Sequence, residues 1–215
     1  VLLDFTRELV DEVPDLASQY EEVVPLYRMY AGQSWVHSVD KPIRTPEDLE
    51  GLNIKVADEA SVALVQAIGG NPVDLPISET YVALETGTLD AVITGPDPLN
   101  TFKFAEVTQY STMLPYATPW LNSRMMNKDV FESMPSEYQD IILENAAWWE
   151  DQLVGVLEQE AQAGLDLAIE EGNEIIELTD EERQAFLDIL EENALEMAEE
   201  LDSQGLNGTE LFENA

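Results

Sequence analysis

The chain contains no cysteine, one histidine and 9 lysine or arginine residues among its 215 positions. The absence of cysteine excludes disulfides, thiolate metal sites and cysteine nucleophiles. A single histidine, His37, cannot by itself form a catalytic triad or a metal cluster, so we expect a hydrogen-bonded structural role for it. No run of 18 or more apolar residues occurs, and the sequence therefore predicts no membrane-spanning helix and no direct membrane insertion.

Acidic residues dominate the charged positions. The chain has 45 aspartates and glutamates and a formal net charge of −36. Such a field repels nucleic-acid phosphates and anionic lipids, so neither is an expected partner. The acids are spread along the chain, as in Asp58-Glu59 and Glu199-Glu200, which is typical of a halophilic or marine protein whose self-repulsion is screened by salt. An ordinary acidic soluble protein is the alternative.

Strand-like and helix-like segments alternate with short joints in the first half of the chain. Residues 1–24 read as helical with a break at Pro14, and two extended segments follow. A β-α-β-α-β rhythm comes next and predicts a mostly parallel sheet with right-handed crossovers. Its expected elements are a short helix begun by Thr45 and Pro46, a strand at 52–56, a helix capped by Asp58 and ended at Gly69-Gly70, a strand at 73–75, a helix capped by Ser78 and ended near Gly87, and a strand at 89–93. The preceding extended segments are 24–30 and 34–39, joined by a turn at 31–33.

The second half is dominated by one long helical pattern. We expect a loop with a short helix at 102–110, a crossing segment at 115–119 and a strand at 122–126. A capping box at 136–139 begins a helix that has no stop signal until Gly172, on the order of 50 Å long, with Gly155 and Gly164 as places where it could bend. A strand at 174–178, a helix begun by a second capping box at Thr179, and a frayed tail from Ser203 complete the expected order.

An ordered set of short motifs resembles a known family. The motifs are Pro42-Ile43, Asp48-Leu49, Gly51-Leu52, Ile54-Lys55-Val56, the turn from Gly69 to Pro72, the run Pro76, Glu79, Tyr81, Ala83, Leu84 and Gly87, then Asp90, and later Asn127, Lys128, Met134 and Pro135. Together they resemble the extracytoplasmic solute-binding proteins of tripartite ATP-independent periplasmic (TRAP) transporters, the DctP family. The resemblance covers essentially the whole chain.

The resemblance implies a periplasmic-binding-protein-like α/β fold. It predicts two α/β lobes with crossing strands and one long bridging helix, and a first lobe that is incomplete because the signature starts close to Val1. We expect residues 1–34 and 121–150 to form a remnant of the first lobe and the start of the bridging helix, and residues 35–120 and 151–215 to form the second lobe.

The implied function is capture of a small organic anion for the TRAP membrane permease subunits, outside the cytoplasmic membrane, in the periplasm or extracellularly, although no signal peptide is visible. The resemblance implies no enzymatic activity, no catalytic residue, no cofactor and no metal. Two alternatives are a ligand-sensing domain of a signalling protein and, less favoured, a carboxylate-metal hydrolase. Asp90 and Asp97, which flank Gly95-Pro96, could hold a hard cation.

The expected ligand-binding residues follow from the resemblance and from strand ends that face a crevice. Lys55 stands where typical members have an arginine that grips a carboxylate, and a lysine keeps the charge but loses the bidentate geometry. The altered pocket favours a monocarboxylate with an apolar portion. The alternatives are a surface ion pair for Lys55 and core packing for the tryptophans. The expected contacts are Lys55, Trp35, Thr94, Asp58, Ile77, Trp120 and Arg124.

Overall fold

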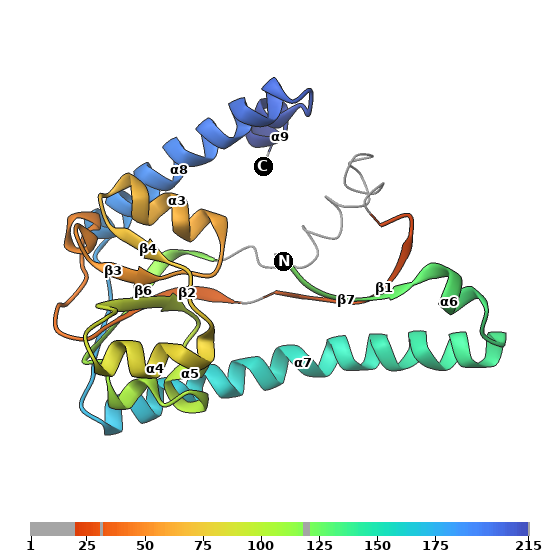
Figure 1. Cartoon of the computed structure of the whole chain (residues 1–215), viewed down its shortest axis with the longest axis horizontal. Coiled ribbons are helices and arrows are strands. Elements are labelled where there is room, and N and C mark those ends of the chain that lie inside the picture. Colours follow the sequence, from red (N-terminus) through yellow and green to blue (C-terminus); the bar gives the residue numbers. More distant parts are fainter. Residues whose placement is uncertain (1–19, 31, 118–120, 215) are drawn as a thin grey trace. The chain divides into compact units, whose positions relative to one another are not determined.

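The computed structural model of the chain describes residues 20–30, 32–117 and 121–214 (Figure 1). The chain divides into two compact units. Unit 1 comprises Val1–Ala31 and Pro119–Gln159, and unit 2 comprises Gly32–Thr118 and Glu160–Ala215. Within the described ranges, no helix is both long and apolar enough to cross a membrane.

Unit 1 is built on a pair of antiparallel strands, β1 (Val23–Tyr30) and β7 (Leu121–Asn127). A short helix, α6 (Lys128–Glu132), follows directly, and the Asn127 side chain caps it by accepting a hydrogen bond from the Val130 backbone N–H at 3.0 Å. The long helix α7 (Ser136–Glu170) begins in this unit. Both strands were expected from the sequence, whereas α6 was not.

The long helix runs without interruption for 35 residues, as the absence of a stop signal before Gly172 predicts. Its start differs from the expected capping box at 136–139. The backbone N–H groups of Tyr138 and Gln139 both donate to the Pro135 carbonyl, at 2.9 and 3.2 Å, so Pro135 takes the cap position and Ser136 is already helical. The Gln139 side chain donates to the Met134 carbonyl instead, at 2.9 Å.

Unit 2 contains a six-stranded mixed sheet in the order β4-β3-β5-β2-β6-β8. Strands β3, β4 and β5 run parallel, as expected, and β8 runs parallel to β6. Strand β2 lies between β5 and β6 and is antiparallel to both. The other five strands of this sheet run in one direction, so the mostly parallel sheet predicted from the sequence is confirmed. The strands are β2 (Gln33–Ser38), β3 (Asn53–Lys55), β4 (Asn71–Val73), β5 (Ala91–Thr94), β6 (Tyr110–Ala117) and β8 (Glu174–Ile176).

Helices cover both faces of this sheet (Figure 1). Ala91 and Ile93 of β5 belong to a buried cluster with residues of α3 (Glu59–Ala67) and α8 (Asp180–Ser203). The intervening Val92 belongs to a second cluster, with residues of α4 (Ile77–Glu85), α5 (Asp97–Thr101) and the end of α7. The alternation of neighbouring β5 residues between the clusters is the two-residue period of a strand. Unit 2 therefore has a core on each side of its sheet.

Short elements complete unit 2, and some depart from the sequence-based expectation. The 3₁₀ turns η1 (Pro46–Leu49) and η2 (Phe104–Glu106) match the expected short helix and the mixed loop region. Strand β6 and helix α9 (Gly208–Asn214) were not expected. Ser78 does not cap α4, because the helix begins at Ile77 and Pro76 holds the cap position. The helix expected over residues 1–24 lies largely outside the described residues, and positions 20–22 form a turn before β1.

Candidate functional site

Three of the predicted ligand-binding residues lie together at one edge of the sheet in unit 2. Lys55 ends β3 and pairs with Val92 of β5, and Thr94 lies two residues further along β5. Trp35 near the start of β2 pairs with Thr94. Paired residues, and residues two apart in one strand, share a face of the sheet. The register therefore places Trp35, Lys55 and Thr94 on one face, at the carboxyl ends of the parallel strands.

Lys55 is a buried cation, with only 7% of its surface exposed. Its Nζ donates to the backbone carbonyl of the neighbouring Val56 at 3.2 Å. Burial lowers the pKa of Lys55, and the nearby charges of Asp74 and Asp58 partly oppose that shift. Among the described residues, Lys41, Arg44 and Lys103 form ion pairs with acidic side chains, whereas Lys55 does not. Lys55 thus differs from Lys41 and Lys103, which are exposed and pair with acidic side chains.

Trp35 is buried, with 8% exposure, and stacks on His37. The ring centroids are 6.4 Å apart and the planes differ by 5°. His37 Nε2 lies 3.2 Å from the Gly95 carbonyl and Nδ1 lies 2.8 Å from Ser111 Oγ. Since a carbonyl only accepts, Nε2 carries the proton and Nδ1 accepts from the Ser111 hydroxyl. Burial lowers the pKa of His37 to about 4, so the ring is neutral, and its expected structural role is confirmed.

Asp58 is held in place at the start of α3. Its Oδ1 accepts a hydrogen bond from the Ser61 backbone N–H at 2.8 Å, and its Oδ2 accepts from Ser61 Oγ at 2.7 Å. Because the Ser61 hydroxyl donates its hydrogen bond to Asp58, the Tyr116 hydroxyl must be the donor in its 3.0 Å hydrogen bond with Ser61 Oγ. Burial raises the pKa of Tyr116 to about 12, which keeps that hydroxyl protonated. This series of hydrogen bonds fixes the Asp58 carboxylate beyond the end of β3.

The sequence did not identify Tyr116 and Ser61 as supports of the site. The spacing of Asp58 and Ser61, three residues apart at a helix start, is the usual N-cap arrangement and was a usable signal. The position of Tyr116 was not, because it depends on β6, and a crossing segment rather than a strand was expected at 115–119. Its hydroxyl meets Ser61 over 55 positions of sequence.

The remaining predicted residues fall in different places. Ile77 begins α4 and packs against the cluster that contains Val92, on the same side of the sheet as Lys55. Arg124 lies in β7 of unit 1, where it pairs with Tyr27 and is exposed. Trp120 lies outside the described residues. Ile77 therefore lies on the same side of the sheet as Trp35, Lys55 and Thr94. Arg124 belongs to the other unit.

Asp90 and Asp97, the two aspartates considered for a cation, lie on either side of β5. The Asp90 carboxylate accepts a hydrogen bond from the Asn53 backbone N–H at 2.7 Å and so ties β3 to the turn before β5. Asp97 begins α5, and burial together with the charge of Glu160 raises its pKa. Across the described part of the chain, no group of three histidine or acidic side chains is placed to hold a metal ion.

The sequence profile of one family matches nearly the whole chain. Its description is bacterial extracellular solute-binding protein, family 7 (DctP), and the match covers residues 11–201. This chain belongs to that family. The resemblance read from the motifs is therefore confirmed, and with it the recognition of the chain as a TRAP solute-binding protein of the DctP family.

Curated relatives match part of their own length. The 2,3-diketo-L-gulonate-binding periplasmic protein YiaO of Escherichia coli is 30% identical over 140 residues, which are 63% of this chain and 41% of the relative. The C4-dicarboxylate-binding periplasmic protein DctP of Rhodobacter capsulatus is 28% identical over 176 residues, 79% of this chain and 51% of the relative. The chain thus spans about half or less of the length of these relatives.

Solved structures share the fold. A marine metagenome TRAP solute-binding protein, specific for aromatic acid ligands and in complex with metahydroxyphenylacetate, superposes with a TM-score of 0.84 at 21% identity, covering 99% of this chain and 67% of that chain. A TRAP solute-binding protein of Rhodoferax ferrireducens with copurified benzoate gives a TM-score of 0.79 at 22% identity, covering 95% and 65%. The mixed α/β fold of periplasmic binding proteins, expected from the sequence, is confirmed.

Proposed function

We propose that this protein captures a small organic acid outside the cytoplasmic membrane and delivers it to the membrane subunits of a TRAP transporter. The observation that carries the proposal is Lys55, a buried cation at the carboxyl ends of parallel strands, in a chain of this family. Ligands of open α/β sheets bind at such strand ends. The two curated relatives described above are periplasmic binding proteins, which supports a periplasmic or extracellular location and a role in binding rather than catalysis.

The proposed ligand is a monocarboxylate with an apolar or ring portion. Lys55 neutralises the carboxylate as a point charge, without the two-pronged geometry of an arginine. Trp35 supplies an aromatic surface on the same face of the sheet, and Thr94 supplies a hydroxyl. Asp58 and Ile77 border this group, while Arg124 and Trp120 remain proposed contacts from elsewhere in the chain. Two proteins of the same fold hold ligands of this kind, metahydroxyphenylacetate and benzoate.

The test is a comparison of ligand affinity by isothermal titration calorimetry in molar salt, with benzoate and 3-hydroxyphenylacetate as first probes and the full chain as the sample. Lys55→Met removes the charge and keeps the length of the side chain. Loss of a charge-assisted hydrogen bond costs about 1.5–3 kcal/mol, so we expect binding to weaken roughly 10- to 100-fold. Lys55→Arg should retain measurable binding, because the charge remains.

Lys103→Met is the matched control, since Lys103 is exposed and pairs with Glu106 three residues away. It should bind as the unmodified protein does. Unchanged affinity in Lys55→Met, with a normal unfolding profile, would remove Lys55 from the site and leave the proposal without its main support.

A further inference from the structure

Lys55 is accompanied by two carboxylates, and this distinguishes its surroundings from those of a simple anion anchor. Lys55 pairs with Val73 in β4, and Asp74 follows Val73 directly. Asp58 follows Lys55 by three positions, at the cap of α3. Both acids therefore lie at the same strand ends as the ammonium group. Their charges act on Lys55, that of Asp74 more than that of Asp58.

The two carboxylates are held differently. Asp58 is held by hydrogen bonds from the backbone N–H and the hydroxyl of Ser61, which fix its carboxylate at the start of α3. Asp74 is exposed at the end of β4. The formal sum of Lys55, Asp58 and Asp74 is one negative charge. A ligand that carries only a carboxylate would add a second net negative charge next to Lys55, whose positive charge the two aspartates already balance.

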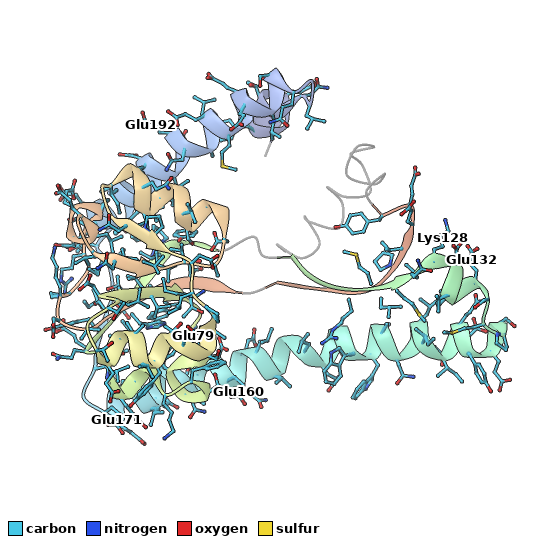
Figure 2. All side chains as sticks on the ribbon, in the orientation of Figure 1. Glu79, Lys128, Glu132, Glu160, Glu171 and Glu192 are labelled. Carbon is cyan, nitrogen blue, oxygen red and sulfur yellow. The ribbon has the colours of Figure 1, made fainter. Side chains whose placement is uncertain are left out.

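Other features of unit 2 favour a positive group as well. The indole of Trp35 lies on the same face of the sheet as Lys55, and indole is the aromatic ring that attracts cations most strongly. The net charge of −36 repels anions over long range, and the acids come from several elements, among them Glu79 of α4, Glu160 of α7 and Glu192 of α8 (Figure 2). A ligand with no net charge approaches this surface without that repulsion.

We propose that the ligand of this site is a zwitterion, a carboxylic acid that also carries a cationic nitrogen group. This inference rests on the proposed function and narrows its ligand class. The carboxylate binds Lys55 Nζ, and the cationic group faces the carboxylates of Asp58 and Asp74. Lys55, with Asp58 and Asp74 at the same strand ends, is then complementary to a ligand with separated charges of both signs.

The experiment measures Kd for matched pairs of ligands that differ only in the cationic nitrogen. One pair is L-phenylalanine and 3-phenylpropanoate, and the other is L-proline and cyclopentanecarboxylate. We expect the zwitterion of at least one pair to bind about tenfold or more tightly than its plain carboxylate, the gain from one added ion pair in a partly buried site. Phenethylamine, which lacks the carboxylate, should bind more weakly than phenylalanine because nothing meets Lys55.

Variants assign the preference to the two acids. Asp74→Asn and Asp58→Asn should each move the ratio of the Kd of the plain carboxylate to the Kd of its zwitterion toward one, mainly by weakening the binding of the zwitterion. Asparagine is as good an N-cap as aspartate, so Asp58→Asn keeps the start of α3. Asp40→Asn, at an exposed aspartate of unit 2, is the control and should leave the ratio unchanged.

The outcomes separate the two proposals. Plain carboxylates that bind as tightly as their zwitterionic partners, or more tightly, would overturn the zwitterion and leave the proposed capture of an organic acid standing. Phenethylamine binding as tightly as phenylalanine would also overturn it. Should neither member of either pair, nor any carboxylate probe, bind to the full chain in low or molar salt, the proposed function fails and this inference fails with it.

Discussion

Replacement of Gly164 by alanine tests how closely the end of α7 packs in unit 2. A Cβ built on Gly164 would lie 2.0 Å from the Pro96 carbonyl oxygen and 2.9 Å from its carbon. Real Cβ atoms essentially never come within 3.0 Å of another heavy atom, so the helix and the Pro96 turn would have to separate by about 1 Å. The obstacle is backbone and cannot rotate away. Glycine at this position is therefore required by contact rather than by backbone conformation.

Helix propensity and overpacking have opposite effects on the stability of Gly164→Ala. Alanine favours a helix interior over glycine by about 1 kcal/mol. Overpacking a tight contact costs about 1–3 kcal/mol, and a backbone obstacle belongs at the upper end of that range. We expect Gly164→Ala to lower the free energy of unfolding by about 1–2 kcal/mol. The same substitution at Gly155, in the same helix and with nothing within 4 Å of the added Cβ, should raise it by about 0.5–1 kcal/mol.

The assay is urea unfolding followed by far-UV circular dichroism at constant molar salt, for the two variants and the unmodified chain. Gly155 belongs to unit 1 and Gly164 to unit 2, so tryptophan fluorescence should be recorded as a second probe in case the units unfold separately. Equal or greater stability of Gly164→Ala relative to Gly155→Ala would show that α7 does not contact the Pro96 turn as closely as described.

Two further substitutions are expected to affect stability. Burial holds the pKa of His37 at about 4, below the ordinary value of 6.5, so the unfolded chain takes up a proton that the folded chain does not as the pH falls. The stability contributed by neutral His37 is complete above pH 6.5 and is lost between pH 6.5 and 4, on the order of 3 kcal/mol. The difference in unfolding free energy between the unmodified chain and His37→Asn should therefore shrink over that window. Parallel pH profiles of the two proteins would contradict this. Thr179→Ala should lower the free energy of unfolding by about 1 kcal/mol, because it removes the hydroxyl that accepts a hydrogen bond from the Glu182 N–H at the start of α8. Thr179→Ser keeps the hydroxyl and should not lower it. Equal melting temperatures for the two variants would show that the cap contributes nothing.

Local signals in the sequence located most elements of unit 2 because the residues that begin and end them act over three or four positions. Asp58 caps α3 and Thr179 caps α8, as expected. Gly69 ends the segment after α3 with a φ of 74°, a conformation that favours glycine. The strands expected at 73–75 and 89–93 lie at 71–73 and 91–94, since the edges of short strands are set by pairing with neighbours rather than by their own residues.

The elements that escaped prediction depend on tertiary contacts. Strand β6 contains Pro115 and the buried polar residues Ser111 and Thr112, and no strand was expected there. In the fold, Ser111 hydrogen-bonds His37, and the Thr112 hydroxyl donates to the Ile43 carbonyl at 2.7 Å, so these polar groups are satisfied inside the sheet. Helix α9 begins at Gly208. A Cβ on Gly208 would come within 2.3 Å of the Ala198 carbonyl oxygen, so the position of α9 depends on packing against α8.

The candidate site divides in the same way. Lys55 and Thr94 could be located from sequence because each ends a strand of the β-α-β rhythm, and parallel strands end at one edge. The placement of Trp35 on the same face as Lys55 required the register of β2 against β5, which no local pattern gives. The acids beside Lys55 were visible in the sequence, but their effect on the charge of the site follows only from the pairing of Lys55 with Val73.

The turn after Thr94 shows how the fold prepares this edge for a ligand. The Gly95 carbonyl accepts a hydrogen bond from His37 Nε2 of β2, and the Pro96 carbonyl lies against Gly164 of α7. Two independent elements therefore hold the backbone directly beyond Thr94, and a ligand that uses its hydroxyl meets a group that is already ordered. Gly164→Ala moves one of these supports and His37→Asn removes the other. If Thr94 contacts the ligand, both variants should weaken binding even under conditions where they remain folded. Thr179→Ala should not, because Thr179 caps α8 and supports neither Gly95 nor Pro96.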